Sequence, residues 1–144
     1  MRLSTKGRYA VMAMADLARR EGDRAVALAD IAARQEISLS YLEQLFARLR
    51  RVGLVKSSRG PGGGYRLSRP ADQIDIAAIV TAVDEPLRAT RCSGQSKGCM
   101  LKGERCLTHD LWEEMGRQIH GYLASVSLAD VVSGRLGQRQ SEAA

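Results

Sequence analysis

Residues 37–65 read ISLSYLEQLFARLRRVGLVKSSRGPGGGY, and this segment carries the clearest signals of secondary structure. Its first part predicts an α-helix, because apolar side chains recur at every third or fourth position. These positions, which we expect to form a buried stripe, are Leu39, Leu42, Leu45, Phe46 and Leu49. The opposite face carries Ser40, Glu43, Gln44, Ala47 and Arg48. Gly53 is a suitable residue to end this helix, and either Ser38 or a capping box of Ser40 with Glu43 can begin it.

The second part of the stretch predicts a β-hairpin. Residues 54–58 and 65–68 are short strand-like segments, and the turn between them is Arg59-Gly-Pro-Gly-Gly-Gly64. The turn is rich in glycine, but it lacks the Gly-Lys-Ser/Thr ending of a phosphate-binding P-loop, and no helix follows it. We therefore interpret this turn as the tip of a hairpin.

Helical patterns lie on both sides of this stretch. Apolar spacing predicts helices over residues 6–20 and 28–34, with either Ser4 or Thr5 as the cap of the first and a candidate strand at residues 25–27. A fourth helix is predicted at residues 76–83.

A longer helix is predicted from about Thr108 to Val126, and Ser127 with Asp130 forms a capping box that opens a short one. The whole order, with its hairpin directly after the third helix, is typical of a winged helix-turn-helix. We expect a mostly α-helical fold with a small β-hairpin, in which a winged helix-turn-helix is joined to a long dimerisation helix.

Charge is distributed unevenly along the chain. Residues 1–69 contain 14 Lys and Arg against 6 Asp and Glu, a net charge of +8, whereas residues 70–144 have a net charge of −2. A basic half joined to a nearly neutral half is typical of a module that binds a polyanion such as DNA. A general solubilising bias in charge is the plainer alternative.

The predicted third helix carries side chains that can read bases. Gln44 can pair with adenine, Glu43 can accept from the cytosine amino group, and Ser40 can bond to several bases. Arg59, at a slim hairpin tip, suits a narrow minor groove with its enhanced negative potential. The alternatives are an ordinary solvated helix face and a turn that merely needs glycine, but the basic half favours DNA recognition.

Three cysteines and a histidine form the pattern Cys-x6-Cys-x6-Cys-x2-His at Cys92, Cys99, Cys106 and His109. Thiolates and imidazole bind borderline and soft metals. The pattern lacks the Cys-x-x-Cys pair typical of zinc knuckles, so it favours an iron–sulfur cluster modestly over a single zinc ion. A zinc or thiol redox sensor, a thiol enzyme using Cys106 with His109, and three unrelated thiols are the alternatives.

Several segments of this sequence resemble the iron–sulfur cluster regulator (IscR) family of winged-helix repressors. They are MRLSTKGRYAV at residues 1–11, ISLSYLEQLF at 37–46, RGPGGGY at 59–65, AVDE at 82–85, TRC at 90–92 and CLTHDLW at 106–112. Together they cover residues 1 to about 132. Each gap between cysteines has six residues, where a known member of the family has five, and the ligand types are unchanged.

The resemblance implies a homodimer that binds palindromic double-stranded DNA and controls iron–sulfur assembly genes. It implies a [2Fe–2S] cluster on Cys92, Cys99, Cys106 and His109, with iron–sulfur scaffold proteins as candidate donors. The implied DNA contacts are Ser40, Glu43, Gln44 and Arg59. The implied protein is a transcription regulator and not an enzyme.

The sequence also predicts where the protein acts and how the chain divides. No run of 18 apolar residues and no signal peptide is present, so we expect a cytoplasmic protein that does not enter membranes. The expected division is a winged-helix DNA-binding domain at 1–69, a linking helix with a cysteine-rich cluster loop at 70–107, a dimerisation helix with a short carboxyl-terminal helix at 108–133, and a disordered tail at 134–144.

Overall fold

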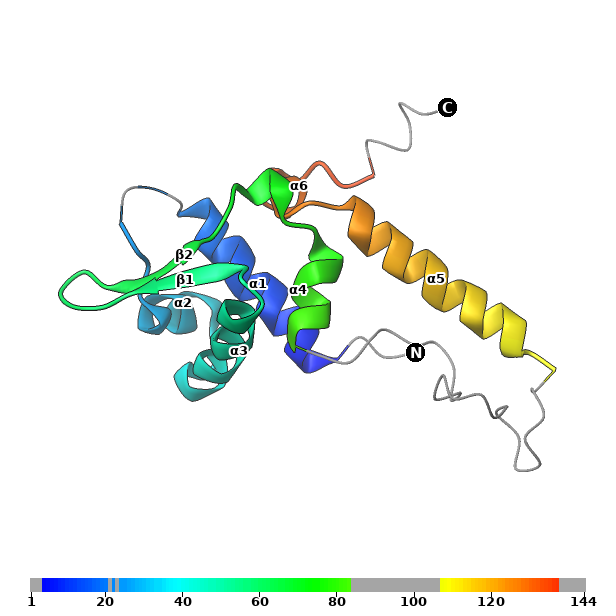
Figure 1. Ribbon diagram of the computed structural model, residues 1–144, viewed down its shortest axis with the longest axis horizontal. Helices are drawn as coiled ribbons and strands as arrows, with labels where there is room; N and C mark the ends of the chain where they lie inside the picture. Colours follow the sequence, from blue (N-terminus) through cyan, green and yellow to red (C-terminus); the bar gives the residue numbers. More distant parts are fainter. Residues whose placement is uncertain (1–3, 21, 23, 84–106, 138–144) are drawn as a thin grey trace.

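The computed structural model describes residues 4–20, 22, 24–83 and 107–137. In chain order its elements are α1 (Thr5–Arg19), α2 (Leu28–Gln35), α3 (Leu39–Arg51), β1 (Val55–Ser58), β2 (Gly64–Leu67), the 3₁₀ helix η1 (Ala71–Gln73), α4 (Ile76–Val83), α5 (His109–Ser125) and α6 (Leu128–Ser133). The predicted mostly helical fold with a small hairpin is confirmed (Figure 1). Among the described residues, no helix is long and apolar enough to cross a membrane.

One hydrophobic core joins α1, α2, α3, α4, α6 and the base of the hairpin. Phe46, Met14 and Ile31 are fully buried at its centre. The predicted apolar face of α4 lies in the same core, and α1 packs against both α4 and α6. Burial of this apolar surface is the main force that holds the helices together.

The start of α3 corrects one prediction and resolves one alternative. Leu39 is 41% exposed and does not belong to the buried stripe, because it lies in the first turn of α3, before the helix reaches the core. Ile37, just before the helix, is buried instead. Ser38 is the N-cap and its hydroxyl accepts a hydrogen bond from the Tyr41 backbone N–H at 3.4 Å. The N-cap is therefore Ser38, and Ser40 does not cap the helix.

The hairpin is antiparallel, with Val55 opposite Leu67 and Ser58 opposite Gly64. The candidate strand at residues 25–27 is reduced to a single bridge, in which the backbones of Val26 and Tyr65 exchange hydrogen bonds of 2.9 and 2.8 Å. A Cβ atom at Gly64 would collide with the Val26 carbonyl. Glycine at this position therefore lets the wing lie directly against the segment before α2.

A buried ion pair fixes α1 to α2. The Asp16 side chain is 3% exposed and accepts hydrogen bonds from Arg34 at 2.7 and 3.0 Å and from Gln35 at 2.8 Å. Burial raises the pKa of Asp16, but the bonds from Arg34 and Gln35 and the charges of Arg34 and Arg20 outweigh it and leave the pKa below its ordinary value. The two helices that support α3 are thus joined by a charged link.

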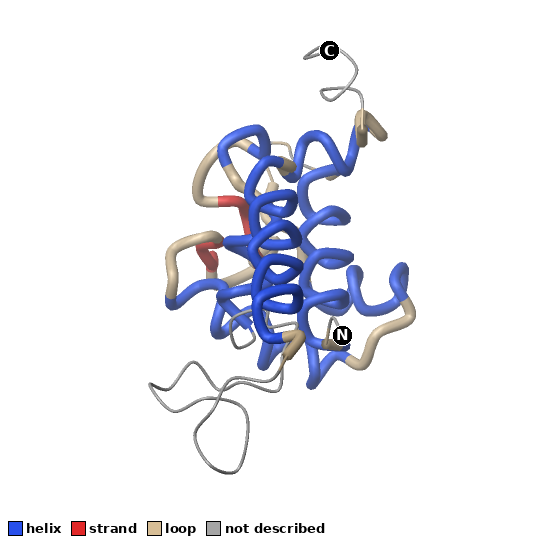
Figure 2. Tube along the Cα trace, turned by 90° about the vertical axis from the view of Figure 1, so that its right-hand side faces the viewer, coloured by secondary structure: helices blue, strands red, loops and turns tan. Residues whose placement is uncertain are grey.

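Helix α5 differs from the other long helices, because none of its 17 residues is buried. It contacts α4, and Leu123 near its carboxyl end packs partly against the core. Its amino end extends away from the body, as the orange-to-yellow helix in Figure 1 shows, and Figure 2 gives the view at right angles. The start of α5, where His109 lies, is therefore distant from the core.

Candidate nucleic-acid interface and metal centre

Helix α3 presents the predicted base-reading residues to solvent. Ser40, Glu43 and Gln44 are all exposed, while Leu42 and Leu45 on the opposite side are buried. Ser40 shares a 3.0 Å hydrogen bond with the Ser38 hydroxyl. In the described part of the chain, the Glu43 and Gln44 side chains make no hydrogen bond, so both can reach a ligand without first breaking an internal contact.

The wing places Arg59 at its exposed tip. The turn that follows Arg59 is closed by a 2.8 Å hydrogen bond from the Gly63 N–H to the Gly60 carbonyl, and Gly60 and Gly62 have φ angles of 94° and 74°. Such angles strain residues that carry a Cβ atom, so the glycines allow a narrow tip. Figure 1 shows the hairpin extending from the body near α2 and α3. A narrow tip with one cation suits insertion into a groove of DNA.

Helix α3 is also bonded to the end of α4. Arg48 lies one turn after Gln44, and its Nη1 atom donates a 2.7 Å hydrogen bond to the Val83 carbonyl. Val83 is the last residue of α4, and the segment with the three cysteines begins directly after it. This link could not be predicted from the sequence, because the two residues lie 35 positions apart.

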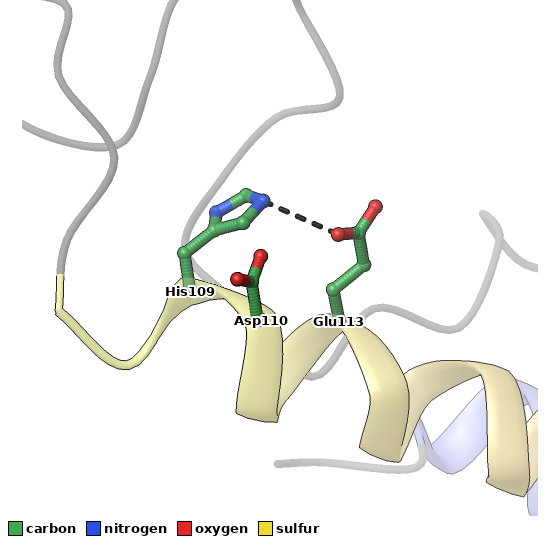
Figure 3. Close-up of side chains that lie close together, drawn as sticks. All are labelled: His109, Asp110 and Glu113. Atoms are coloured by element: carbon green, nitrogen blue, oxygen red, sulfur yellow. Dashed lines mark ion pairs between the residues drawn. The ribbon is translucent and has the colours of Figure 1, made fainter.

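His109 is the one predicted metal ligand that the structure describes. It is the first residue of α5, and its side chain is 13% exposed. Its Nε2 atom lies 3.4 Å from Oε2 of Glu113, one turn later (Figure 3). Asp110 lies beside this pair, and the nearest ligand atoms of the three residues are all within 4.8 Å of one another. Cys92, Cys99 and Cys106 lie outside the described residues.

The sequence analysis did not single out Glu113 or Asp110. The spacing of His109 and Glu113, four residues apart on a predicted helix, places both side chains on one face and could have indicated their contact.

The sequence and the fold of this chain match a family of regulators. A model of the family Rrf2, described as iron-dependent transcriptional regulators, matches residues 3–134. The chain belongs to the Rrf2 family. Its winged helix-turn-helix is therefore that of a DNA-binding transcription regulator, and the protein is not an enzyme.

Individual relatives of this Rrf2 regulator agree with the family match. The chain is 55% identical over 135 residues to the HTH-type transcriptional regulator IscR of Serratia proteamaculans, which covers 94% of this chain and 81% of that protein. The structure of IscR from T. potens superposes with a TM-score of 0.76 at 38% identity, covering 94% and 88% of the two chains. That of CymR, the global cysteine regulator of B. subtilis, has a TM-score of 0.78 at 34% identity and covers 92% and 97%.

Proposed function

We propose that this Rrf2 regulator binds promoter DNA as a homodimer and that a [2Fe–2S] cluster controls its occupancy there. The ligands are Cys92, Cys99, Cys106 and His109. The observation that carries the proposal is this set of three thiols and one imidazole in a chain 55% identical to a regulator named IscR. Three thiolates and an imidazole are a suitable donor set for a cluster of this kind, as Rieske centres illustrate for histidine ligation.

His109 suits the role of a ligand at one corner of the cluster. It is nearly buried and begins α5, three residues after Cys106. A cluster with three thiolate ligands carries net negative charge, which the positive end of the helix dipole stabilises. When bound, the cluster supplies a labile redox group whose presence depends on iron and oxidants. His109 then connects that group directly to the first turn of α5.

The exposed face of α3 and the wing tip read DNA in this account. Gln44 and Ser40 bond to base edges in the major groove, and Arg59 enters the adjacent minor groove. Glu43 acts as a discriminator, because its carboxylate is repelled by phosphates unless a cytosine amino group meets it. Glu43→Ala should broaden the range of sites bound and reduce the difference between cluster-loaded and cluster-free protein, and binding arrays that show unchanged specificity would contradict this role.

Helix α5 provides the dimer interface. Its exposed apolar residues Leu111, Trp112 and Tyr122 are 60%, 38% and 45% accessible in one protomer. Beside it lies a mainly apolar cleft of about 480 Å³, lined by residues of α4, α5 and the segment before β1 together with the charged residues Arg69 and Asp75. Large apolar surfaces left open on one protomer favour association. A second copy of this chain, related by a two-fold axis, would cover this face and match a palindromic DNA site.

The likeness to relatives named IscR also supports a proposal for where the protein acts and which genes it controls. A regulator that resembles IscR this closely would act in the cytoplasm on iron–sulfur assembly genes, with scaffold proteins as cluster donors. A second candidate function is a zinc or thiol sensor that uses the same cysteines. CymR, which has a similar fold, is described as a global cysteine regulator, so this fold also serves a regulator whose description names no iron.

Anaerobic purification tests the proposal against the second candidate. We expect coloured protein with two irons and two sulfides per protomer, and Cys92→Ala, Cys99→Ala and Cys106→Ala should each give colourless protein that still folds. Colourless wild-type protein with one zinc ion per protomer would support the zinc sensor instead. Colourless protein without metal, whose DNA binding responds to thiol oxidants, would support the thiol sensor.

A further inference from the structure

We propose that Glu113 is a positioning residue that orients His109 toward the cluster. This inference rests on the proposed function, because the proposed cluster supplies the metal that the His109 imidazole would bind. The Glu113 carboxylate lies one helical turn after His109, with Oε2 3.4 Å from Nε2. Figure 3 shows the ring and the carboxylate turned toward each other across one face of α5. In this arrangement Nε2 faces the Glu113 carboxylate, so Nδ1 is the nitrogen that would bind iron.

A carboxylate behind a ligating imidazole has a known physical effect. It accepts the N–H of the nitrogen that faces away from the metal, which fixes the tautomer and the ring orientation and makes the ligand more basic. The His109 ring is 13% exposed, whereas Glu113 is 48% exposed, so the contact lies at the edge of the site on its solvent side. Glu113 also adds negative charge close to the cluster, and this charge opposes reduction.

Arg117 explains why Glu113 acts as a hydrogen-bond acceptor and not as a metal ligand itself. Its Nη1 atom lies 3.8 Å from Oε1 of Glu113, so the carboxylate is flanked by the His109 ring on one side and a guanidinium on the other. A cation beside Oε1 opposes the binding of a second cation there. The positive amino end of α5 opposes it as well.

Glu114 offers a matched control on the same helix. It has the same charge and similar exposure, but it accepts from Gln118 at 2.8 Å and from Arg117 at 2.9 Å and makes no described contact with His109. The hydrogen bonds from Gln118 and Arg117 lower the pKa of Glu114. Replacing Glu114 therefore removes the same charge from α5 and also frees Arg117 of one partner, while it leaves the described contact between Glu113 and His109 in place.

The first experiment follows cluster loss and reduction potential in anaerobically loaded wild-type protein, Glu113→Ala, Glu113→Gln and Glu114→Ala. Outer partners of metal ligands typically contribute 10–100-fold to affinity. We therefore expect Glu113→Ala to lose its cluster about 10-fold faster and to have a higher potential. Glu113→Gln keeps an acceptor oxygen, so it should restore retention while the potential stays raised. Glu114→Ala should match wild type, and equal behaviour of Glu113→Ala and Glu114→Ala would overturn the inference.

The second experiment uses cluster-free protein and so separates this inference from the proposed function. The chain has two histidines, so ¹⁵N NMR with a His120→Gln variant assigns the His109 ring unambiguously. With the ring neutral, we expect the Nε2–H tautomer in wild type, in Glu113→Gln and in Glu114→Ala, and a mixture of tautomers in Glu113→Ala. The same tautomer distribution in all four proteins would overturn the role of Glu113. Wild-type protein that binds no cluster would contradict the proposed function, and the tautomers would still decide whether Glu113 orients the ring.

Discussion

Helices α3 and α5 are both amphipathic, but only the apolar face of α3 is buried within the protomer. Helix α3 buries Leu42, Leu45, Phe46 and Leu49 almost completely, whereas α5 buries none of its residues. The stability of α3 therefore comes from packing within the chain, and the apolar face of α5 is open to another molecule. This difference supports the proposals that the body holds the DNA-reading residues and that α5 contacts a second molecule.

The largest expected effect comes from making the same change in both helices. Leu42→Ala removes a fully buried side chain and should lower the free energy of unfolding by about 3–5 kcal/mol. Leu111→Ala removes a side chain that is 60% exposed, and it should change the stability of the isolated protomer by less than about 0.5 kcal/mol. Urea denaturation at several protein concentrations, extrapolated to the protomer, measures both. Equal losses would refute the contrast between the two helices.

A charge on α5 should break the dimer without unfolding the body. Ile119 is a partly buried residue of α5 that lies between Leu111 and Tyr122 in the chain, and Ile119→Asp would place a carboxylate inside the proposed interface. An unpaired buried charge of this kind costs about 2 kcal/mol or more, so the dissociation constant should rise at least about 30-fold. Sedimentation measures association, and Gly121→Asp is the control, because Gly121 is exposed, has open space around it and is not on the helix face that Leu111 and Tyr122 share. If wild-type protein sediments as a monomer at micromolar concentration and still binds DNA tightly, α5 is not a dimer interface.

The ion pair between α1 and α2 should make the body sensitive to acid. Because the Asp16 pKa is lowered on folding, the carboxylate stabilises the native state above its unfolded pKa of about 3.9, and this contribution is lost as the pH falls through the lower folded value. Asp16→Asn should cost about 2 kcal/mol at pH 7, since it weakens the charged bonds to Arg34. The difference from wild type should shrink in denaturation curves taken toward pH 2.5. A difference that stays constant with pH would show that the Asp16 charge contributes nothing.

The smallest effects distinguish the two reading elements within the body. Gln44→Ala should cost about 1–3 kcal/mol at a cognate DNA site and less on random DNA, because it removes a contact to a base. Arg59→Ala should weaken binding by a margin that decreases as salt rises, because part of its contribution is phosphate charge. Fluorescence anisotropy with cognate and random duplexes at several salt concentrations measures both changes. Identical profiles for the two variants would contradict the separate roles.

Much of the body could be predicted from the sequence, because its signals are local. Hydrophobic spacing gave the helices to within one or two residues, and the glycine-rich turn gave the wing. The prediction that Leu39 is buried was wrong. The apolar periodicity of the sequence extends to the end of the helix, whereas burial depends on where the helix reaches the core. The strand predicted at residues 25–27 is a single bridge in the structure, because only Val26 pairs with Tyr65.

The tertiary links could not be predicted in this way. Asp16 and Arg34 lie 18 residues apart, and only the packing of α1 on α2 brings them together. Nothing in the local pattern of either helix indicates the pair. In the candidate metal centre the sequence predicted four ligands, of which His109 lies in the described residues. The contact of Glu113 with His109 became visible only in the geometry of α5. The roles of Ser40, Glu43, Gln44 and Arg59 stay predictions, although all four side chains are exposed.

Control of DNA binding by the cluster can be measured by titrating one DNA site with the same protein before and after cluster removal. The site should be a palindrome selected from random sequence with the cluster-loaded protein. Fluorescence anisotropy under anaerobic conditions measures the dissociation constant in each state, and Cys99→Ala serves as a permanently cluster-free control. We expect cluster removal to weaken binding at least about 10-fold, and the stripped wild type should then have the same dissociation constant as Cys99→Ala. Equal dissociation constants for loaded and stripped protein would contradict it.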